Sequence, residues 1–223
     1  MKPLHIDLTL PITRLVLIGG GEFSFGETRE IDEQLIKKLP ADNKRVAFLP
    51  TASGSAEYAT HIGNYFKQID PEVETINVPV YRQRDSRRRK NLDLIRFAGL
   101  IYLGGGVTNN LLTTLRGSPA ELALRDAAAN GAVVAAIGAA ASSFGAHARD
   151  MDGGGALDGL GWFEHTVLDA GFDAANDTTL RRLMSLPDVE TGVGIPTSTA
   201  IVVESSGATR VIGPGNIAAF RKR

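Results

Sequence analysis

The chain alternates short, uniformly apolar runs with longer segments in which apolar residues recur every three or four positions. The uniform runs predict buried strands, and they lie at 15–18, 46–49, 74–80, 99–103 and 132–137. The periodic segments predict amphipathic helices, which lie at 27–39, 56–68, 92–97, around Leu111 to Leu115, and at 119–129. Strands that alternate with helices predict an α/β fold with a doubly wound, mainly parallel sheet flanked by helices. We expect one domain over residues 1–223.

The pattern changes after residue 149. A glycine-rich loop is expected at 149–161, followed by a partial strand at 162–168 and a helix at 178–186. Two strands across a turn are expected within 191–204, and 209–221 has the pattern of a closing hairpin. These segments predict antiparallel strands near the C-terminus.

The strand at 132–137 runs directly into a turn of small residues, GAAASS, from Gly138 to Ser143. A strand, a tight turn and a helix are the parts of a nucleophile elbow, which holds a reactive side chain at its tip. We expect the tip at Ala140, which has no group to attack a carbonyl. The glycine run Gly19–Gly21 is expected to be a structural turn at the edge of the sheet in preference to a phosphate cradle, and it lacks the G-x-G-x-x-G spacing of a dinucleotide site. A second run, Gly104–Gly106, ends the strand at 99–103.

Composition excludes several classes of chemistry. The chain has no cysteine, which excludes disulfides, thiolate metal sites and a cysteine nucleophile. A net charge of −1 gives no overall attraction to nucleic acid or to an anionic membrane. Arg82 to Lys90 is strongly basic, but no aromatic residues are interleaved, so we expect a solvated loop and no nucleic-acid binding. Met1–Pro11 has no long apolar run, so neither a signal peptide nor a membrane span is expected, and the expected location is cytoplasmic.

Six blocks of sequence share their order and spacing with a known family. Four are well defined, at 18–22 (IGGGE), 48–53 (FLPTAS), 101–108 (IYLGGGVT) and 138–143; two are weaker, at 169–172 (DAGF) and 192–200 (GVGIPTSTA). From Arg14 onward the chain resembles the cyanophycinase and aspartyl dipeptidase (dipeptidase E) family of serine peptidases. The resemblance implies a class I glutamine amidotransferase-like, flavodoxin-like fold and a homodimer.

The resemblance also implies positions for a catalytic triad. The family's nucleophile matches Ala140, its histidine matches Gly171, and its acidic residues match Pro196 and Thr197. None of these residues supplies a nucleophile, base or acid for acyl transfer. The chain is therefore expected to be a noncatalytic homologue that binds a small molecule or peptide with a carboxylate, or that serves as a scaffold.

The remaining pocket is expected at the carboxyl edge of the sheet, where backbone amides can bind a carboxylate or carbonyl oxygen. Its expected lining consists of small residues and one carboxylate: Gly20, Gly21, Glu22, Gly105, Gly106, Ala140 and Ala141. We expect no cofactor, and no metal either, because the aspartates of 149–161 lack the spacing of a calcium loop.

Two alternatives stay open. In one, Ser142 or Ser143 is the relocated nucleophile of a hydrolase acting on acidic peptides or amides, with His147 or His165 as its base. Ser143 and His147 are four residues apart and would share one face of a helix; otherwise the serines cap the helix and the histidines pack or face solvent. In the other alternative, the chain is a structural subunit that meets a partner through the basic segment 82–90.

Overall fold

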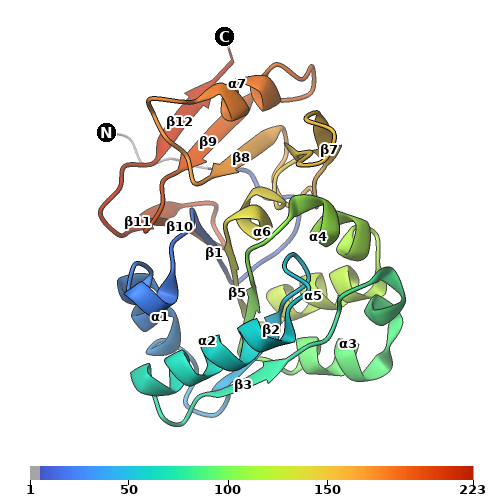
Figure 1. Cartoon of the computed structure of the whole chain (residues 1–223), viewed down its shortest axis with the longest axis vertical. Helices are drawn as coiled ribbons and strands as arrows, with labels where there is room; N and C mark the ends of the chain where they lie inside the picture. The colour runs from blue at the N-terminus through green and yellow to red at the C-terminus, as the bar shows by residue number, and fades with distance from the viewer. Residues whose placement is uncertain (1–5, 223) are drawn as a thin grey trace.

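A computed structural model describes residues 6–222 and is built around a seven-stranded sheet of order β11-β10-β1-β5-β4-β2-β3 (Figure 1). Five strands are parallel: β1 (Arg14–Ile18), β5 (Val133–Ile137), β4 (Leu100–Leu103), β2 (Arg45–Leu49) and β3 (Glu74–Asn77). Two antiparallel strands extend the sheet beyond β1, namely β10 (Ala200–Glu204) and β11 (Thr209–Ile212). The predicted fold class, a mainly parallel sheet with antiparallel strands near the C-terminus, is confirmed.

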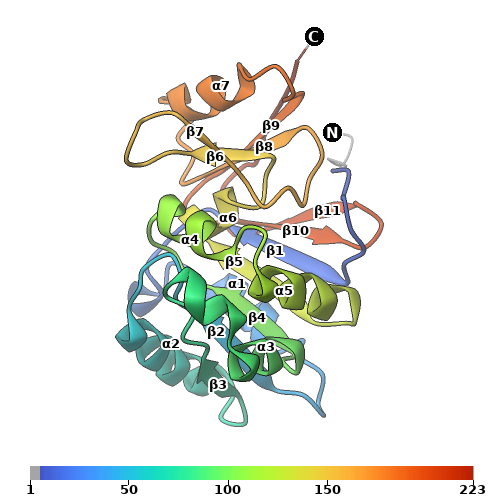
Figure 2. The same cartoon turned by 90° about the vertical axis from the view of Figure 1, so that its right-hand side faces the viewer.

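Both faces of this sheet are covered by helices, which explains why its central strands β1, β5, β4 and β2 are almost entirely apolar. Leu15 and Leu17 of β1 belong to one core, and Val16 and Ile18 to the other, because successive side chains of a strand point to opposite faces. The first core is closed by α3 (Arg89–Arg96), α4 (Thr108–Leu115) and α5 (Pro119–Ala129), and the second by α1 (Arg29–Ile36) and α2 (Ala56–Ile69). Figures 1 and 2 show these two layers from two sides. The two helical layers cover the faces of the central strands, so the catalytic-type site expected from the elbow lies at the ends of these strands.

A second, smaller sheet lies at the end of the molecule that carries the C-terminus (Figure 1). Its order is β12-β9-β8, with β12 (Ala218–Arg221), β9 (Thr191–Ile195) and β8 (Thr166–Ala170), and α7 (Thr178–Met184) packs on it. Beside it, β6 (His147–Arg149) and β7 (Ala156–Asp158) form a short hairpin. The sequence predicted only a loop there, because strands of three residues are too short to show an alternating pattern.

The two strands predicted across a turn within 191–204 are present as β9 and β10, although they lie in different sheets. The predicted closing hairpin is wrong, because β11 and β12 do not pair with each other. The apolar pattern identifies a strand but does not specify which neighbour it pairs with. As a result, the connection from Pro196 to Thr199 crosses from the small sheet to the large one, next to the end of β1.

The basic segment 82–90 is not the solvated loop that was predicted. It forms a 3₁₀ helix, Gln83–Arg87, that leads directly into α3. Asp85 and Ser86 are buried, and the Asp85 carboxylate accepts hydrogen bonds from the backbone N–H groups of Tyr81 and Arg82. The buried Asn91 side chain donates to the backbone carbonyl of Asp85 at 2.9 Å. The exposed cations of this segment are therefore held on a fixed backbone.

Within residues 6–222, no helix is both long and apolar enough to cross a membrane. The first five residues of Met1–Pro11, on which the expectation about a signal peptide partly rests, lie outside the described residues.

Candidate functional site

The elbow turns sharply at Gly138, the residue between β5 and the short helix α6 (Ala139–Ser142). Gly138 has φ of 58° and ψ of −125°, a strained conformation that only glycine adopts at little cost. Apart from atoms of the adjacent residues Ile137 and Ala139, no heavy atom would lie within 4 Å of a Cβ atom on Gly138, so a side chain here would point into open space. Ala140, where the tip was expected, lies inside α6 and is fully buried. The expected position was therefore wrong by two residues, and the residue at the tip has no side chain.

The two other segments that were expected near the elbow do meet it, around the end of β1. Gly138 donates its N–H to the carbonyl of Ile18. Gly171 lies beside Gly19, since a Cβ atom added to Gly171 would be 3.6 Å from the Gly19 carbonyl oxygen. Gly19 is so close to Pro196 that a Cβ on it would lie 2.1 Å from the Pro196 carbonyl oxygen. Thr197 is exposed beside Pro196. The three segments gather at one place, but they bring no titratable side chain from these positions.

The glycines of the expected ligand lining lie at an exposed or half-buried edge, whereas its alanines are buried. Gly20, Gly21 and Gly105 are half-buried and Gly106 is exposed, whereas Ala140 and Ala141 are fully buried and cannot line a pocket. Their burial follows from the two-residue shift of the tip, which puts both alanines on the inner face of α6.

Glu22 and Tyr58 are two of the polar side chains at this edge. Glu22 is exposed and caps the 3₁₀ turn Phe23–Phe25, since its carboxylate accepts from the backbone N–H and the hydroxyl of Ser24 at 3.1 and 3.0 Å. Burial raises the pKa of Tyr58 to about 12, so its hydroxyl stays protonated beside the backbone N–H of Gly105. The edge therefore offers neutral hydrogen-bonding groups, with the carboxylates of Glu22 and Glu27 at its rim, and the Glu27 carboxylate accepts the N–H of Glu22 at 2.7 Å.

Both serines after the elbow form hydrogen bonds with the backbone. Ser143 is fully buried and donates its hydroxyl to the Ala139 carbonyl at 2.8 Å. The Ser142 hydroxyl oxygen accepts the N–H of Ala170 at 3.0 Å and so ties α6 to β8. The helix ends at Ser142 and His147 begins β6, so the expected Ser143–His147 pair on one helical face does not form.

The two histidines belong to a separate cluster around Asp188. His147 Nε2 lies 2.7 Å from the Asp188 carboxylate, and its Nδ1 lies 3.5 Å from Asp158. His165, with φ of 49°, places Nδ1 2.8 Å from the Asp188 carbonyl oxygen, a contact that raises the pKa of His165. His165 precedes β8 and Gly171 follows it, so the length of the strand, about 17 Å, separates this imidazole from the elbow. No sequence motif pointed to this cluster, because its members are far apart along the chain.

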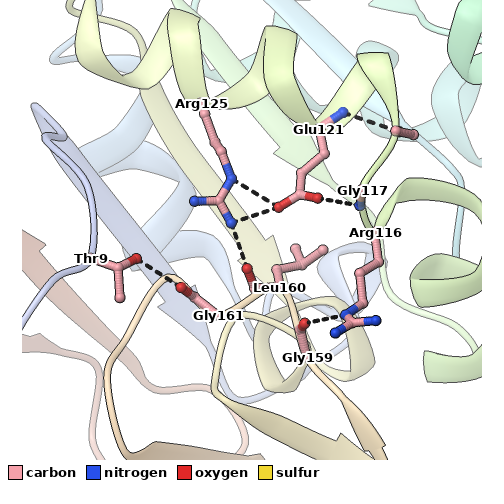
Figure 3. Close-up of polar contacts among 9 residues, drawn as sticks. Thr9, Arg116, Gly117, Glu121, Arg125, Gly159, Leu160 and Gly161 are labelled. Atoms are coloured by element: carbon pink, nitrogen blue, oxygen red, sulfur yellow. Dashed lines mark hydrogen bonds and ion pairs between the residues drawn. The ribbon is translucent and has the colours of Figure 1, made fainter.

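Behind α6, a polar network holds the segment Gly159–Gly161 against α5 and the end of α4 (Figure 3). Arg125 donates to the buried Glu121 at 2.7 Å and also to the Leu160 carbonyl, while Arg116 donates to Gly159 at 3.1 Å. Leu160 in turn donates its N–H to the Ser143 carbonyl at 2.7 Å. The network therefore fixes α6 from behind, although it contributes nothing to the open side of the elbow.

A buried carboxyl group lies behind the loop that follows β1. Asp32 is fully buried, and its Oδ2 accepts the Thr28 hydroxyl at 2.6 Å, while Oδ1 has no hydrogen-bond partner. The Tyr65 hydroxyl lies close enough to lower the pKa of Asp32 slightly, but no hydrogen bond of good geometry joins the two groups. Burial dominates and raises the pKa of Asp32 to about 7. The Thr28 side chain also lies beside Gly21, so the buried Asp32–Thr28 pair adjoins the candidate site.

Two solved structures share this fold. A peptidase from an acI-B1 Actinobacterium superposes with a TM-score of 0.77 and is 24% identical, with 93% of this chain and 90% of that chain covered. A candidate peptidase E protein from Listeria monocytogenes EGD-e has a TM-score of 0.56 and 18% identity, with 95% of this chain and 100% of that chain covered. At these identities the similarity shows the fold alone.

Sequence comparison goes further. The uncharacterized peptidase YgaJ of Bacillus subtilis (strain 168) is 31% identical over 161 residues, a match that covers 70% of this chain and 59% of YgaJ. The chain thus spans less than two thirds of the length of that relative. A sequence model of peptidase family S51 matches residues 15–211, from β1 into β11. The resemblance inferred from the six blocks is confirmed, and the chain belongs to peptidase family S51.

Proposed function

We propose that this chain is a member of family S51 that has lost the serine-peptidase reaction and acts as a ligand-binding or scaffold protein. The observation that carries the proposal is Gly138 at the tip of the elbow. The strained turn that presents a nucleophile in enzymes of this geometry here presents only backbone, so no covalent intermediate can form at that position.

The surroundings of the tip support the same proposal. A serine nucleophile needs a base within hydrogen-bond reach, and the base needs an orienting acid. Gly171 and Pro196 lie beside Gly19 at the end of β1, and neither has a titratable group. The Ser143 hydroxyl donates to a backbone carbonyl and the Ser142 hydroxyl oxygen accepts a backbone N–H, which argues against a displaced nucleophile at either position.

The ligand we propose carries a carboxylate or a carbonyl oxygen and lies across the glycine-rich edge. The neutral Tyr58 hydroxyl, beside the backbone N–H of Gly105, is suited to donate to such an oxygen. The open space in front of Gly138 leaves room for it.

Hydrolysis tests the loss of activity. The purified full chain is incubated with dipeptides that carry an N-terminal aspartate, and the released amino acids are quantified. We expect no release above that of the heat-denatured protein. Hydrolysis by the wild type that disappears in Ser142→Ala or Ser143→Ala would overturn the proposal, because that loss separates activity of this chain from a contaminating peptidase.

Ligand binding is tested by thermal shift with aspartyl and arginyl dipeptides and with the same dipeptides amidated at the C-terminus. A ligand present at one hundred times its Kd stabilises a protein by about 2.7 kcal/mol, which corresponds to a rise in Tm of roughly 5–10 °C for a chain of this size. We expect the free carboxylates to stabilise the chain more than the amides do, and Tyr58→Phe to reduce that difference. No stabilisation by any of these ligands would leave only the scaffold role.

A further inference from the structure

The basic segment 82–90 plays no part in the candidate site. It carries six basic side chains and one carboxylate, a net charge of +5, in a chain whose total net charge is −1. Its cations are exposed, whereas Asp85 is buried and used internally to hold the backbone. Such a fixed concentration of positive charge creates a local potential that attracts an acidic partner.

This charge borders an apolar groove. The groove has a volume of about 400 Å³ and lies between α3 and the strands β2 and β3, at the opposite end of the molecule from α7 (Figure 1). Its floor includes Ile76 and Leu94, and Phe97 is 64% exposed beside them. An exposed aromatic side chain of this kind is a typical anchor of a protein contact.

The rim of the groove is basic and only loosely paired. Arg89 lies 3.7 Å from Asp93, and Arg45 lies 3.5 Å from Glu74, with all four side chains exposed to solvent. Within residues 6–222, no ion pair is formed by Lys90. Exposed pairs of this kind contribute little to stability, so the cations are free to exchange partners when an acidic group arrives.

The groove also borders an open edge of the sheet. β3 is the last strand, so one row of its backbone N–H and C=O groups has no neighbouring strand. An extended segment can add to such an edge, with alternate side chains directed toward the groove.

We propose that this groove binds an acidic, extended segment of another protein, which places at least one large apolar side chain against Phe97 and its carboxylates against Arg45, Arg89 and Lys90. The proposal does not depend on the proposed function, because the groove shares no residue with the glycine-rich edge.

Charge and polarity distinguish this occupant from two others. A second copy of the chain docked through the same face would bring two basic rims together, and like charges facing each other oppose association. A nucleic acid would satisfy the cations with phosphates but would leave the apolar floor uncovered, and this segment has no interleaved aromatic residues for base stacking.

The test measures fluorescence anisotropy of the full chain with a fluorescein-labelled glutamate peptide that has a central Leu-Phe pair. One matched peptide replaces the pair with two serines, and another replaces the glutamates with lysines. We expect the first peptide to bind, the serine peptide to bind more weakly, the lysine peptide not to bind, and the affinity to fall as salt is added.

Variants locate the contact. Lys90→Glu and Phe97→Ser are each expected to raise the Kd of the acidic peptide about tenfold, through lost ion pairing and lost apolar contact respectively. Lys67→Glu, an equal charge change at an exposed position of α2 on the other side of the sheet, is expected to leave the Kd unchanged. An unchanged urea midpoint in each variant checks that the fold is intact.

Three results would overturn the proposal. The acidic peptide fails to bind, or Lys67→Glu weakens binding as much as Lys90→Glu does, or Phe97→Ser leaves the Kd unchanged. The proposal would also be rejected if the chain bound duplex DNA, RNA or anionic vesicles more tightly than the acidic peptide and if Lys90→Glu abolished that binding. This result would assign the surface to a different class of partner.

Discussion

Replacing Gly138 by alanine separates the strain of the elbow from crowding at its tip. The combination of φ 58° and ψ −125° costs an L-residue roughly 1–3 kcal/mol, and alanine recovers about 0.4–1 kcal/mol by restricting the unfolded chain. No heavy atom beyond the adjacent residues lies within 4 Å of the added Cβ, so we expect no additional free-energy cost from steric overlap. The free energy of unfolding should fall by about 1 kcal/mol, which lowers Tm by roughly 2–4 °C. Urea unfolding and calorimetry measure both quantities.

Two matched variants test the reasoning. Gly54→Ala has a φ of 69° and equally open surroundings, so it should cost about as much as Gly138→Ala. Gly19→Ala would place its Cβ 2.1 Å from the Pro196 carbonyl oxygen and should cost more than about 3 kcal/mol. If Gly138→Ala is as damaging as Gly19→Ala, the tip is crowded and has no room for a side chain. If it stabilises the protein, Gly138 is not at a strained turn.

Three further predictions concern the surroundings of the site. Burial raises the pKa of Asp32 to about 7, so the folded chain binds this proton more tightly than the unfolded chain does, and the stabilisation from that proton is lost as pH rises from about 4 to 7. Asp32→Asn should therefore gain stability relative to the wild type by about 2–3 kcal/mol more at pH 8 than at pH 5, as measured by urea unfolding; an equal difference at both pH values would contradict the raised pKa. Arg125→Met leaves the buried Glu121 carboxylate without its cation and should lower the urea-derived free energy of unfolding by about 2 kcal/mol. A much smaller loss would show that the Arg125–Glu121 ion pair is dispensable for stability. Gly138→Ser should fold but remain unable to hydrolyse aspartyl dipeptides, because Gly171 provides no base, and measurable turnover would reject that reason.

The sequence was sufficient to predict the main sheet, because strands covered on both faces must be apolar at every position. β1 and β5 show this most clearly, since each is a run of apolar residues ended by glycine. The small sheet was not predictable in the same way. β9 and β10 both have the pattern of strands, but only contacts made by distant segments decide that one pairs with β8 and the other with β1.

The position of the elbow tip shows a different limit. The run from Gly138 to Ser143 consists of small residues whose sizes and polarities barely differ, so a shift of two residues changes almost nothing in the pattern. The backbone conformation decides the register, because Gly138 alone in this run has positive φ. The absence of a nucleophile at the tip was nevertheless predicted, since every residue that could occupy it within the run Gly138 to Ala141 lacks a reactive group. The Asp188 cluster had no sequence signal, because His147 and Asp188 are 41 residues apart.

The central claim, that this family member has no serine nucleophile, is tested most directly by reaction with a fluorophosphonate probe followed by intact-mass spectrometry. The probe phosphonylates activated serines, and an authentic serine hydrolase in the same tube confirms that it is reactive. The account predicts that the wild-type chain keeps its unmodified mass after the control enzyme has reacted completely. A stoichiometric adduct on the wild-type chain, mapped to Ser142, Ser143 or any other serine, would contradict it.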